Sequence, residues 1–218
     1  MVQKTKKPSE RRIEAPIAPK RRGRPRAYEP EVALGKALEL FRKGGFAATS
    51  LDDLSAATGM NRPSLYGAFG DKRELYIKSY QRYRDDARAA TAEIFRQEMP
   101  IRKRLERIYG VALDIYFAGE EGPSGCFTVM TAGSEAVADP DIRAMVLDAL
   151  SELDRAFARC FSRAMEKGEL KEGADPLVLG QLASATLHTL AIRSRAGVPR
   201  KELEAIVSGA LDVMVVAQ

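Results

Sequence analysis

The stretch of sequence that decides the fold is TGMNRPSLYGAFG, which runs from Thr58 to Gly70. Between Gly59 and Gly70 it carries a helical pattern of only about eight residues, whereas an isolated helix needs roughly 12–15 residues to be stable in water. Asn61 is a good N-cap, and Pro63 falls in the first turn, where its missing N–H is harmless. The sequence therefore predicts a short helix that neighbouring helices must hold in place.

Helices are predicted on both sides of this stretch. An apolar pattern with spacings of three and four residues covers 30–45 and ends at two glycines. Ser50 with Asp53 resembles a capping box that starts the next helix, and Asp71 with Glu74 resembles a second one that opens a long helix toward residue 100. Three helices so close together, the last two separated by a glycine turn, are typical of a helix-turn-helix unit.

The remainder of the chain also has helical periodicity. Five more helices are predicted, at about 101–118, 125–137, 141–167, 175–195 and 200–216. We find no alternating strand pattern and no internal repeat. The expected fold class is all-α, with about nine helices.

Charge is distributed unevenly along the chain. Residues 1–27 hold 10 Lys/Arg and 2 Asp/Glu, a formal charge of +8, whereas residues 28–218 hold 25 and 28, a formal charge of −3. A basic, Pro-rich segment with few aliphatic residues predicts a disordered arm that binds nucleic acid or an anionic membrane. The alternative is a solvated leader without a partner.

Several classes of protein are disfavoured by composition. No apolar run approaches the roughly 18–20 residues of a membrane span, and the charged N-terminus does not resemble a secretory signal. The two cysteines have no paired spacing, which indicates a reducing cytoplasm, and a single histidine disfavours a Cys/His metal site. Without nucleophile, phosphate-loop or zinc-protease motifs, an enzyme is not expected, and neither is a cofactor.

The outward side of the short helix has the side chains of a DNA reader. Arg62 can donate to guanine or phosphate, Ser64 can contact either, and Tyr66 can reach a phosphate. Gly67 would let the DNA backbone approach closely, while Thr49 and Lys72 are predicted at the starts of flanking helices, where phosphate is favoured. The predicted DNA-binding set of this unit is Thr49, Arg62, Pro63, Ser64, Tyr66, Gly67 and Lys72. The alternative is a three-helix module that contacts protein.

The segment ALELFRKGGFAATSLDDLSAATGMNRPSLYGAFGDKRELY, residues 37–76, resembles the TetR family of bacterial transcriptional regulators, most specifically in PSLYGAFGDKRELY. The resemblance implies phosphate contacts for Tyr66 and Lys72, and groove-facing positions for Arg62 and Ser64. Gly67 departs from the bulkier residue common in the family. The domains expected are a disordered basic arm (1–27), a helix-turn-helix DNA-binding domain (28–75) and a helical effector-binding and dimerisation domain (76–218).

The basic arm contains KRRGRPRAY, which resembles an AT-hook core. Arg22, Arg24 and Arg26 are predicted to enter an A·T-rich minor groove. The alternative for them is nonspecific binding to phosphates.

The resemblance implies that residues 76–218 dimerise and bind a small effector. A dimer would place two reading helices about one DNA turn apart on a near-palindromic operator. The last two predicted helices, at about 175–195 and 200–216, resemble the pair that forms a four-helix dimer interface in this family. The predicted interface residues are His188, Leu203, Ile206, Val207, Ala210, Leu211 and Met214, with His188 alternatively in the core. The predicted effector contacts are Tyr109, Tyr116, Phe117, Cys126, Phe127, Met130, Met145 and Phe157. For each of these the alternative is a core position, and Cys126 is a packed residue or a reactive thiol.

The expected function is a cytoplasmic, dimeric repressor that a small, largely apolar effector releases from DNA. Activation instead of repression is open at this point. A rival interpretation is an architectural DNA binder that uses only its basic arm. The sequence names neither the effector nor the operator.

Overall fold

The computed structural model describes residues 29–119 and 122–215. This part of the chain is almost entirely helical and contains no strand, so the all-α prediction is confirmed. Its helices are α1 (Pro30–Ala48), α2 (Leu51–Thr58), α3 (Arg62–Phe69), α4 (Lys72–Arg96), α5 (Ile101–Phe117), α6 (Gly133–Glu135), α7 (Pro140–Glu166), α8 (Pro176–Arg195) and α9 (Arg200–Met214), with a π-helix at Thr128–Ala132.

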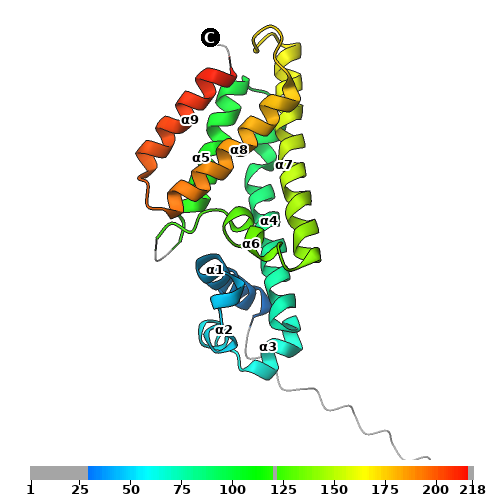
Figure 1. The fold of residues 1–218 in the computed structure, drawn as a ribbon, viewed down its shortest axis with the longest axis vertical. Coiled ribbons are helices and arrows are strands. Elements are labelled where there is room, and N and C mark those ends of the chain that lie inside the picture. The colour runs from blue at the N-terminus through cyan, green and yellow to red at the C-terminus, as the bar shows by residue number, and fades with distance from the viewer. Residues whose placement is uncertain (1–28, 120–121, 216–218) are drawn as a thin grey trace, which may run out of the picture.

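The helices are arranged in two parts along the long axis of the molecule (Figure 1). Helices α1, α2 and α3 lie together at one end, against the first turns of α4. Helices α5, α7, α8 and α9 lie toward the other end, and α4 runs from one part into the other. Among the described helices, none has the length and apolar character needed to cross a membrane.

The short helix α3 is held by its caps and by its inner side. The Asn61 side chain accepts a hydrogen bond from the Ser64 N–H at 2.9 Å, and Gly70 ends the helix at φ 85°. Leu65 and Phe69 are buried in a core shared with α1, α2 and α4. Packing against these helices therefore compensates for the low stability of an eight-residue helix.

Both predicted capping boxes are present, at the starts of α2 and α4. The first helix differs from the prediction, because it continues past the glycine pair to Ala48. Gly45 interrupts it with φ 76° and ψ −179°, so the predicted stop is a kink between two helical segments.

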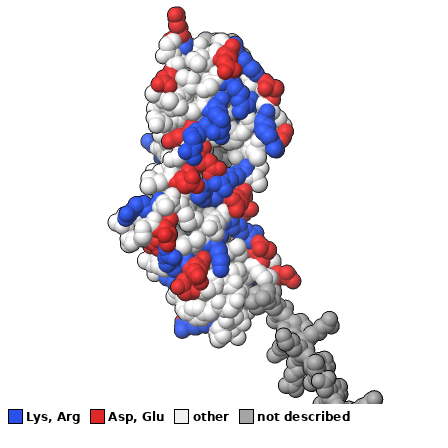
Figure 2. Space-filling view, turned by 90° about the vertical axis from the view of Figure 1, so that its right-hand side faces the viewer, with Lys and Arg blue, Asp and Glu red and all other residues white. Residues whose placement is uncertain are grey.

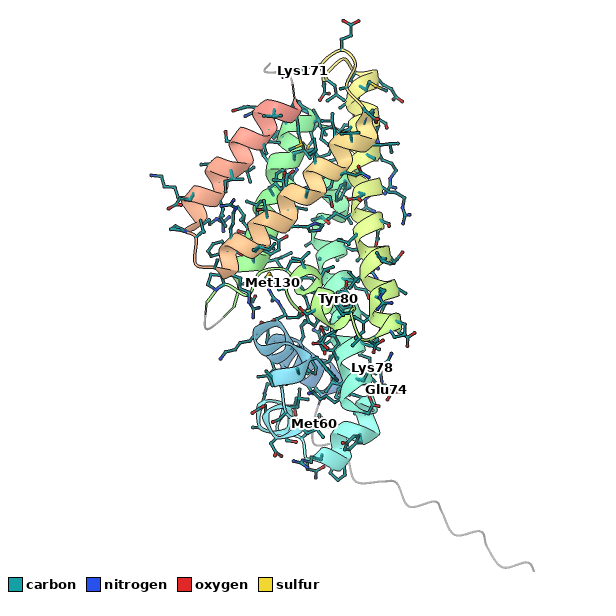
Figure 3. The ribbon with its side chains drawn as sticks, in the orientation of Figure 1. Met60, Glu74, Lys78, Tyr80, Met130 and Lys171 are labelled. Carbon is teal, nitrogen blue, oxygen red and sulfur yellow. The ribbon has the colours of Figure 1, made fainter. Side chains whose placement is uncertain are left out.

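The helix predicted over 125–137 begins later and winds more widely. Residues 123–126 are not helical, and Gly125 among them adopts φ 66°, with a Cβ position only 2.8 Å from the Ala191 carbonyl oxygen. The π-helix then follows Phe127, whose ring packs edge-on against Tyr76, Tyr80 and Tyr83 at centroid distances of 5.3, 5.4 and 5.8 Å. Figure 3 labels Tyr80 on α4 and Met130 in this segment.

The buried apolar side chains form two clusters, and α4 contributes to both. One cluster combines α1–α3 and the first half of α4 with Phe127, Ile142 and Val146. The other combines Ile94 near the end of α4 with α5, α7, α8 and α9. The predicted domain boundary at residue 75 falls inside the continuous helix α4, and the division into domains stays a prediction.

Candidate nucleic-acid interface and effector site

The outer face of α3 lies at the end of the molecule opposite α9 (Figure 1). Arg62, Pro63, Tyr66 and Gly67 are exposed there and Ser64 is half-buried. No protein atom lies within 4 Å of where a Cβ at Gly67 would be, so protein packing does not require glycine at this position. The face is therefore open to solvent, which the predicted contact with a DNA groove requires.

Arg62 is oriented by a side chain that sequence reasoning missed. Its Nε donates to Asp52 Oδ1 at 3.2 Å, and its Nη2 donates to Asp52 Oδ1 and Oδ2 at 2.8 Å each. The hydrogen bonds that Arg62 donates to the Asp52 carboxylate raise the pKa of the guanidinium. The available signal was an acidic residue in the first turn of the preceding helix, ten positions before the arginine.

Lys72 and Thr49, the two residues predicted to contact DNA from the flanking helices, have different surroundings. Lys72 begins α4 and is half-buried, with its Nζ 4.3 Å from the centre of the Phe46 ring. The prediction of a side-chain contact to DNA from Thr49 is wrong. Thr49 is the C-cap of α1, 4% exposed, and its hydroxyl donates to the Gly45 carbonyl oxygen at 2.7 Å. Arg22, Arg24 and Arg26 lie outside the described residues.

Charge on the body is mixed. On the face shown in Figure 2, Lys/Arg and Asp/Glu side chains are interspersed along the molecule. Many are paired: Arg73 donates to Asp139 from Nε at 2.5 Å and to Asp141 from Nη2 at 2.6 Å, which joins α4 to the start of α7. The Arg73 guanidinium lowers the pKa of the Asp139 carboxyl to about 2.

The predicted effector residues differ in burial and belong to two different apolar clusters. Tyr109, Tyr116, Phe127 and Phe157 are buried, with Phe127 in the cluster around α1–α3 and the other three in the second cluster. The Tyr109 hydroxyl donates to the Ala183 carbonyl oxygen at 3.1 Å, and burial raises its pKa. The other four, Phe117, Cys126, Met130 and Met145, are half-buried.

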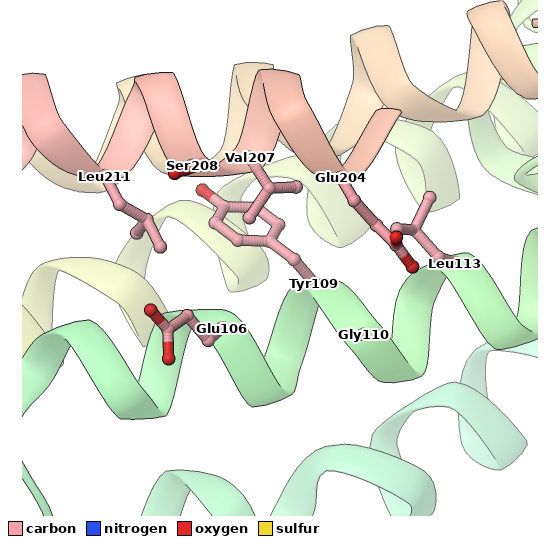
Figure 4. A pocket seen from close by; sticks show the side chains of 8 residues that line it. All are labelled: Glu106, Tyr109, Gly110, Leu113, Glu204, Val207, Ser208 and Leu211. Carbon is pink, nitrogen blue, oxygen red and sulfur yellow. The ribbon is translucent and has the colours of Figure 1, made fainter. Parts of the chain in front are cut away.

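A pocket of about 300 Å³ lies between α5 and α9, on the outer side of Tyr109 (Figure 4). Apart from Tyr109, none of its lining residues was predicted as an effector contact. They are Glu106, Tyr109, Gly110, Leu113, Glu204, Val207, Ser208 and Leu211. The two carboxylates are paired, Glu106 with Arg102 at 3.3 Å and Glu204 with Arg200 at 2.9 Å. The pocket is thus lined mainly by apolar side chains, which form its floor, and the two carboxylates at its rim are neutralised by arginines.

The predicted dimer stripe on α9 points the wrong way for four of its residues. Leu203, Val207, Leu211 and Met214 are buried in the subunit's own core, so they are not available to a partner. The reason is that α9 packs against α5 and α8 on this face. Ile206, Ala210 and His188 are half-buried, and burial lowers the pKa of His188.

One group of exposed apolar side chains lies on faces of α8 and α9 that the predicted interface residues do not cover. On α8 a stripe opposite the buried face repeats every three to four residues, and on α9 Val213 is 72% exposed. Its exposed apolar members are Val178, Leu182, Ala185 and Ile192, and the half-buried Thr189 lies between the last two. The spacing is that of an a/d seam, which packs against another helix.

Two buried or half-buried arginines join the two parts of the molecule. Arg42 of α1 donates from Nη2 to the carbonyl oxygens of Ile115 and Gly125, at 3.0 and 3.2 Å. Arg195 at the end of α8 donates to the carbonyl oxygens of Arg42 and Lys43, at 2.6 and 2.7 Å. The end of α8 is therefore tied directly to α1.

The described residues contain no cluster of His, Cys, Asp and Glu suited to a metal ion. The two cysteines are free and differ in burial, Cys126 being half-buried and Cys160 buried.

Comparisons with known proteins agree with this geometry. Residues 33–78 match the model for bacterial regulatory proteins of the tetR family, and residues 101–209 match the tetracyclin repressor-like C-terminal domain. The HTH-type transcriptional repressor ComR of Escherichia coli K12 is 29% identical over 185 residues, covering 84% of this chain and 88% of ComR. The HTH-type transcriptional repressor BdcR of the same organism is 34% identical over 107 residues, covering 49% of this chain and 54% of BdcR.

A solved structure also resembles the whole molecule. It contains a cysteine mutant of the TetR family regulator CifR in complex with 26-base-pair double-strand operator DNA. The TM-score is 0.77 at 27% identity, with 88% of this chain and all of that chain covered.

Proposed function

The chain belongs to the TetR family of bacterial regulatory proteins, and from this premise we propose that it is a ligand-responsive repressor that binds its operator as a homodimer. Proteins of this family regulate transcription through DNA, and the chain is a DNA-binding regulator and not an enzyme. The observation that carries the proposal is α3, an eight-residue helix anchored by Leu65 and Phe69 that exposes Arg62 and Tyr66. Repression is supported by the likeness to ComR and BdcR, which are both transcriptional repressors.

In this proposal α3 enters the major groove, with Arg62 and Ser64 toward base edges. Tyr66 and the start of α4 at Lys72 meet the flanking phosphates, and Gly67 lets the DNA backbone approach. The basic arm adds contacts in the minor groove. The protein acts in the cytoplasm, because bacterial DNA lies there.

The dimer forms through the exposed seam of α8 together with Val213 of α9. A second copy of the chain is the occupant we assign to this face, because a two-fold contact pairs the same stripe with itself and needs a self-complementary apolar surface. Two copies place their α3 helices about one DNA turn (roughly 34–36 Å) apart, which requires a near-palindromic operator.

The effector site we propose is the pocket between α5 and α9, in place of the buried aromatic residues. Its ionic rim is already paired and its floor is apolar, so it suits a small, largely apolar molecule with one polar group near Ser208. Since α9 packs on both α5 and α8, a molecule that separates α9 from α5 also moves α9 relative to the dimer seam.

Arg195 provides the connection from α8 to the DNA-binding part, because it bonds the backbone of α1. An effector that favours a different position of α8 therefore changes the position of α1 and of α3. It releases DNA only if it binds that second arrangement more tightly than the DNA-bound one.

DNA binding is tested with electrophoretic shifts on the DNA that flanks the gene for this chain. We expect one retarded species whose mass corresponds to a dimer on one duplex. Deleting residues 1–27 should lower the affinity and preserve the sequence preference. If the deletion abolishes all binding, the architectural interpretation replaces this one. A transcriptional reporter carrying the bound DNA separates repression from activation.

The effector site is tested with Gly110→Leu. Apart from the backbone of α5 itself, nothing lies within 4 Å of a Cβ at Gly110, and Gly110 lines the pocket, so the new side chain would extend into it. We expect normal operator binding, followed by anisotropy, but no release by any small molecule that releases the wild type. Normal release from the variant would exclude this pocket as the effector site.

A further inference from the structure

The turn between α2 and α3 is bridged by the ion pair of Asp52 and Arg62. Asp52 lies in the first turn of α2, and Arg62 is the first residue of α3. Their side chains are 77% and 54% exposed, and exposed ion pairs of this kind contribute little to folding. The main effect of the pair is therefore on the orientation of the Arg62 guanidinium.

A guanidinium is planar and offers two edges to an acceptor pair, one formed by Nε with Nη2 and one by Nη1 with Nη2. In Arg62 both Nε and Nη2 donate to the Asp52 carboxylate. Within the described residues Nη1 has no hydrogen-bond partner, and it lies on the far side of the guanidinium from that carboxylate. The edge formed by Nη1 with Nη2 is thus the one that Asp52 leaves free.

This free edge matches the acceptors of one base. Guanine offers O6 and N7 side by side in the major groove, and a bidentate arginine is its usual partner. The first residues of a recognition helix are those that reach base edges. A phosphate is a poorer partner for the held arginine, because the Asp52 carboxylate repels it from the same position.

We propose that Asp52 is a specificity-determining positioning residue, which sets Arg62 to donate to O6 and N7 of a guanine and keeps it from binding phosphates indiscriminately. The proposal rests on the proposed function, since it assumes that α3 reads the major groove. It adds a residue that lies on the preceding helix and need not touch a base itself.

The test uses the full chain and a duplex selected by the wild type from a random-sequence pool. Each guanine of that duplex is replaced in turn by 7-deazaguanine, which lacks the N7 acceptor and keeps its base pairing. For the wild type we expect a loss of about 5–50-fold at one guanine of each half-site. For Asp52→Asn that loss should shrink to about twofold, while affinity for an unrelated duplex stays equal or rises.

Asp53→Asn is the matched control. It removes the same charge one residue away, and its amide oxygen can still accept the Ser50 N–H that Asp53 accepts at 2.8 Å. We expect it to keep the full sensitivity to 7-deazaguanine. Asp52→Ala should behave like Asp52→Asn, and thermal unfolding checks that both variants are folded.

Arg62→Ala separates the two levels of the proposal. It should abolish the guanine sensitivity, and adding Asp52→Asn to it should change nothing further. If Arg62→Ala leaves the sensitivity intact, Arg62 is not a base reader and that part of the proposed function fails. If Arg62→Ala abolishes the sensitivity and folded Asp52→Asn or Asp52→Ala retains it, the role assigned to Asp52 alone is overturned.

Discussion

At the scale of single residues, Tyr66 and Lys72 are expected to bind the DNA backbone and not its bases. Tyr66 is 47% exposed on α3, and Lys72 begins α4. Tyr66→Phe should weaken binding to every duplex by about tenfold, which corresponds to roughly 1.4 kcal/mol for one hydrogen bond to a charged group. Lys72→Ala should reduce the slope of log K against log salt by about one, because one phosphate is no longer neutralised. Fluorescence anisotropy at several salt concentrations measures both, and a change in sequence preference would contradict the assignment.

The Arg73–Asp139 pair predicts a pH dependence of stability. The pKa of Asp139 is lowered to about 2 by Arg73, below the roughly 3.9 of an unfolded aspartate. The contribution of the pair is therefore complete above about pH 4 and is lost as the pH falls through 2. The urea midpoint of the wild type should exceed that of Asp139→Asn at pH 5, and the difference should shrink toward pH 2. Asp175→Asn, which replaces the N-cap aspartate of α8, is the control for capping alone. An unchanging difference for Asp139→Asn would refute the prediction.

Whether the position of a side chain can be predicted from the sequence depends on the interactions that determine it. The inward Leu65 and Phe69 and the outward Arg62 and Tyr66 follow from helical periodicity, which the caps at Asn61 and Gly70 place in register. Thr49 could not be assigned, because the positive φ of Gly45 turns the end of α1 so that the Thr49 hydroxyl reaches a carbonyl. Such a kink leaves no periodic signal.

At the scale of helices, the packing of α7 on α8 depends on Gly180. A Cβ there would lie 2.8 Å from the backbone nitrogen of Ala158 and 3.0 Å from the Asp154 carbonyl oxygen. Because backbone atoms cannot yield cheaply, Gly180→Ala should destabilise the protein by about 1–3 kcal/mol. Gly110→Ala on α5 is the matched control, since it meets nothing within 4 Å and should stabilise by about 0.5–1 kcal/mol. Thermal unfolding at one protein concentration compares the two, and equal effects would contradict the close packing.

Helix positions were predictable where polar caps or prolines mark them, as for α2, α4 and α7. The π-helix at 128–132 was not, because its extra residue per turn changes no cap and follows the packing of Phe127 among three tyrosines from α4. The pocket between α5 and α9 was also out of reach, since it depends on how two helices far apart in sequence pack at Gly110 and Ser208.

At the scale of the whole molecule, an amphipathic helix with two useful faces is ambiguous in sequence. The stripe of Leu203, Val207 and Leu211 is regular enough to suit either a core or a partner, and only the position of α5 decides that it faces the core. On α8 the buried face combines small residues such as Gly180 and Ala183 with Leu187 and Leu190, while Val178, Leu182 and Ile192 stay exposed. The burial of each helix face therefore could not be predicted from the size and spacing of its apolar residues alone.

The dimer surface is tested by Leu182→Glu, which puts a charge in the middle of the exposed α8 seam. Leu182 is 48% exposed in the single subunit, so the subunit should fold with an unchanged melting profile at low concentration. In a dimer the charge is buried against its own copy without a partner, and sedimentation should give a monomer at concentrations where the wild type is a dimer. Operator affinity should fall by at least about a hundredfold, because one α3 must then bind without the second. The control is Ala90→Glu, which adds the same charge at an exposed position of α4, a helix that packs against α5 and α7 of its own subunit. This variant should keep both the dimer and the affinity. A stable Leu182→Glu dimer with wild-type affinity would move the interface away from α8.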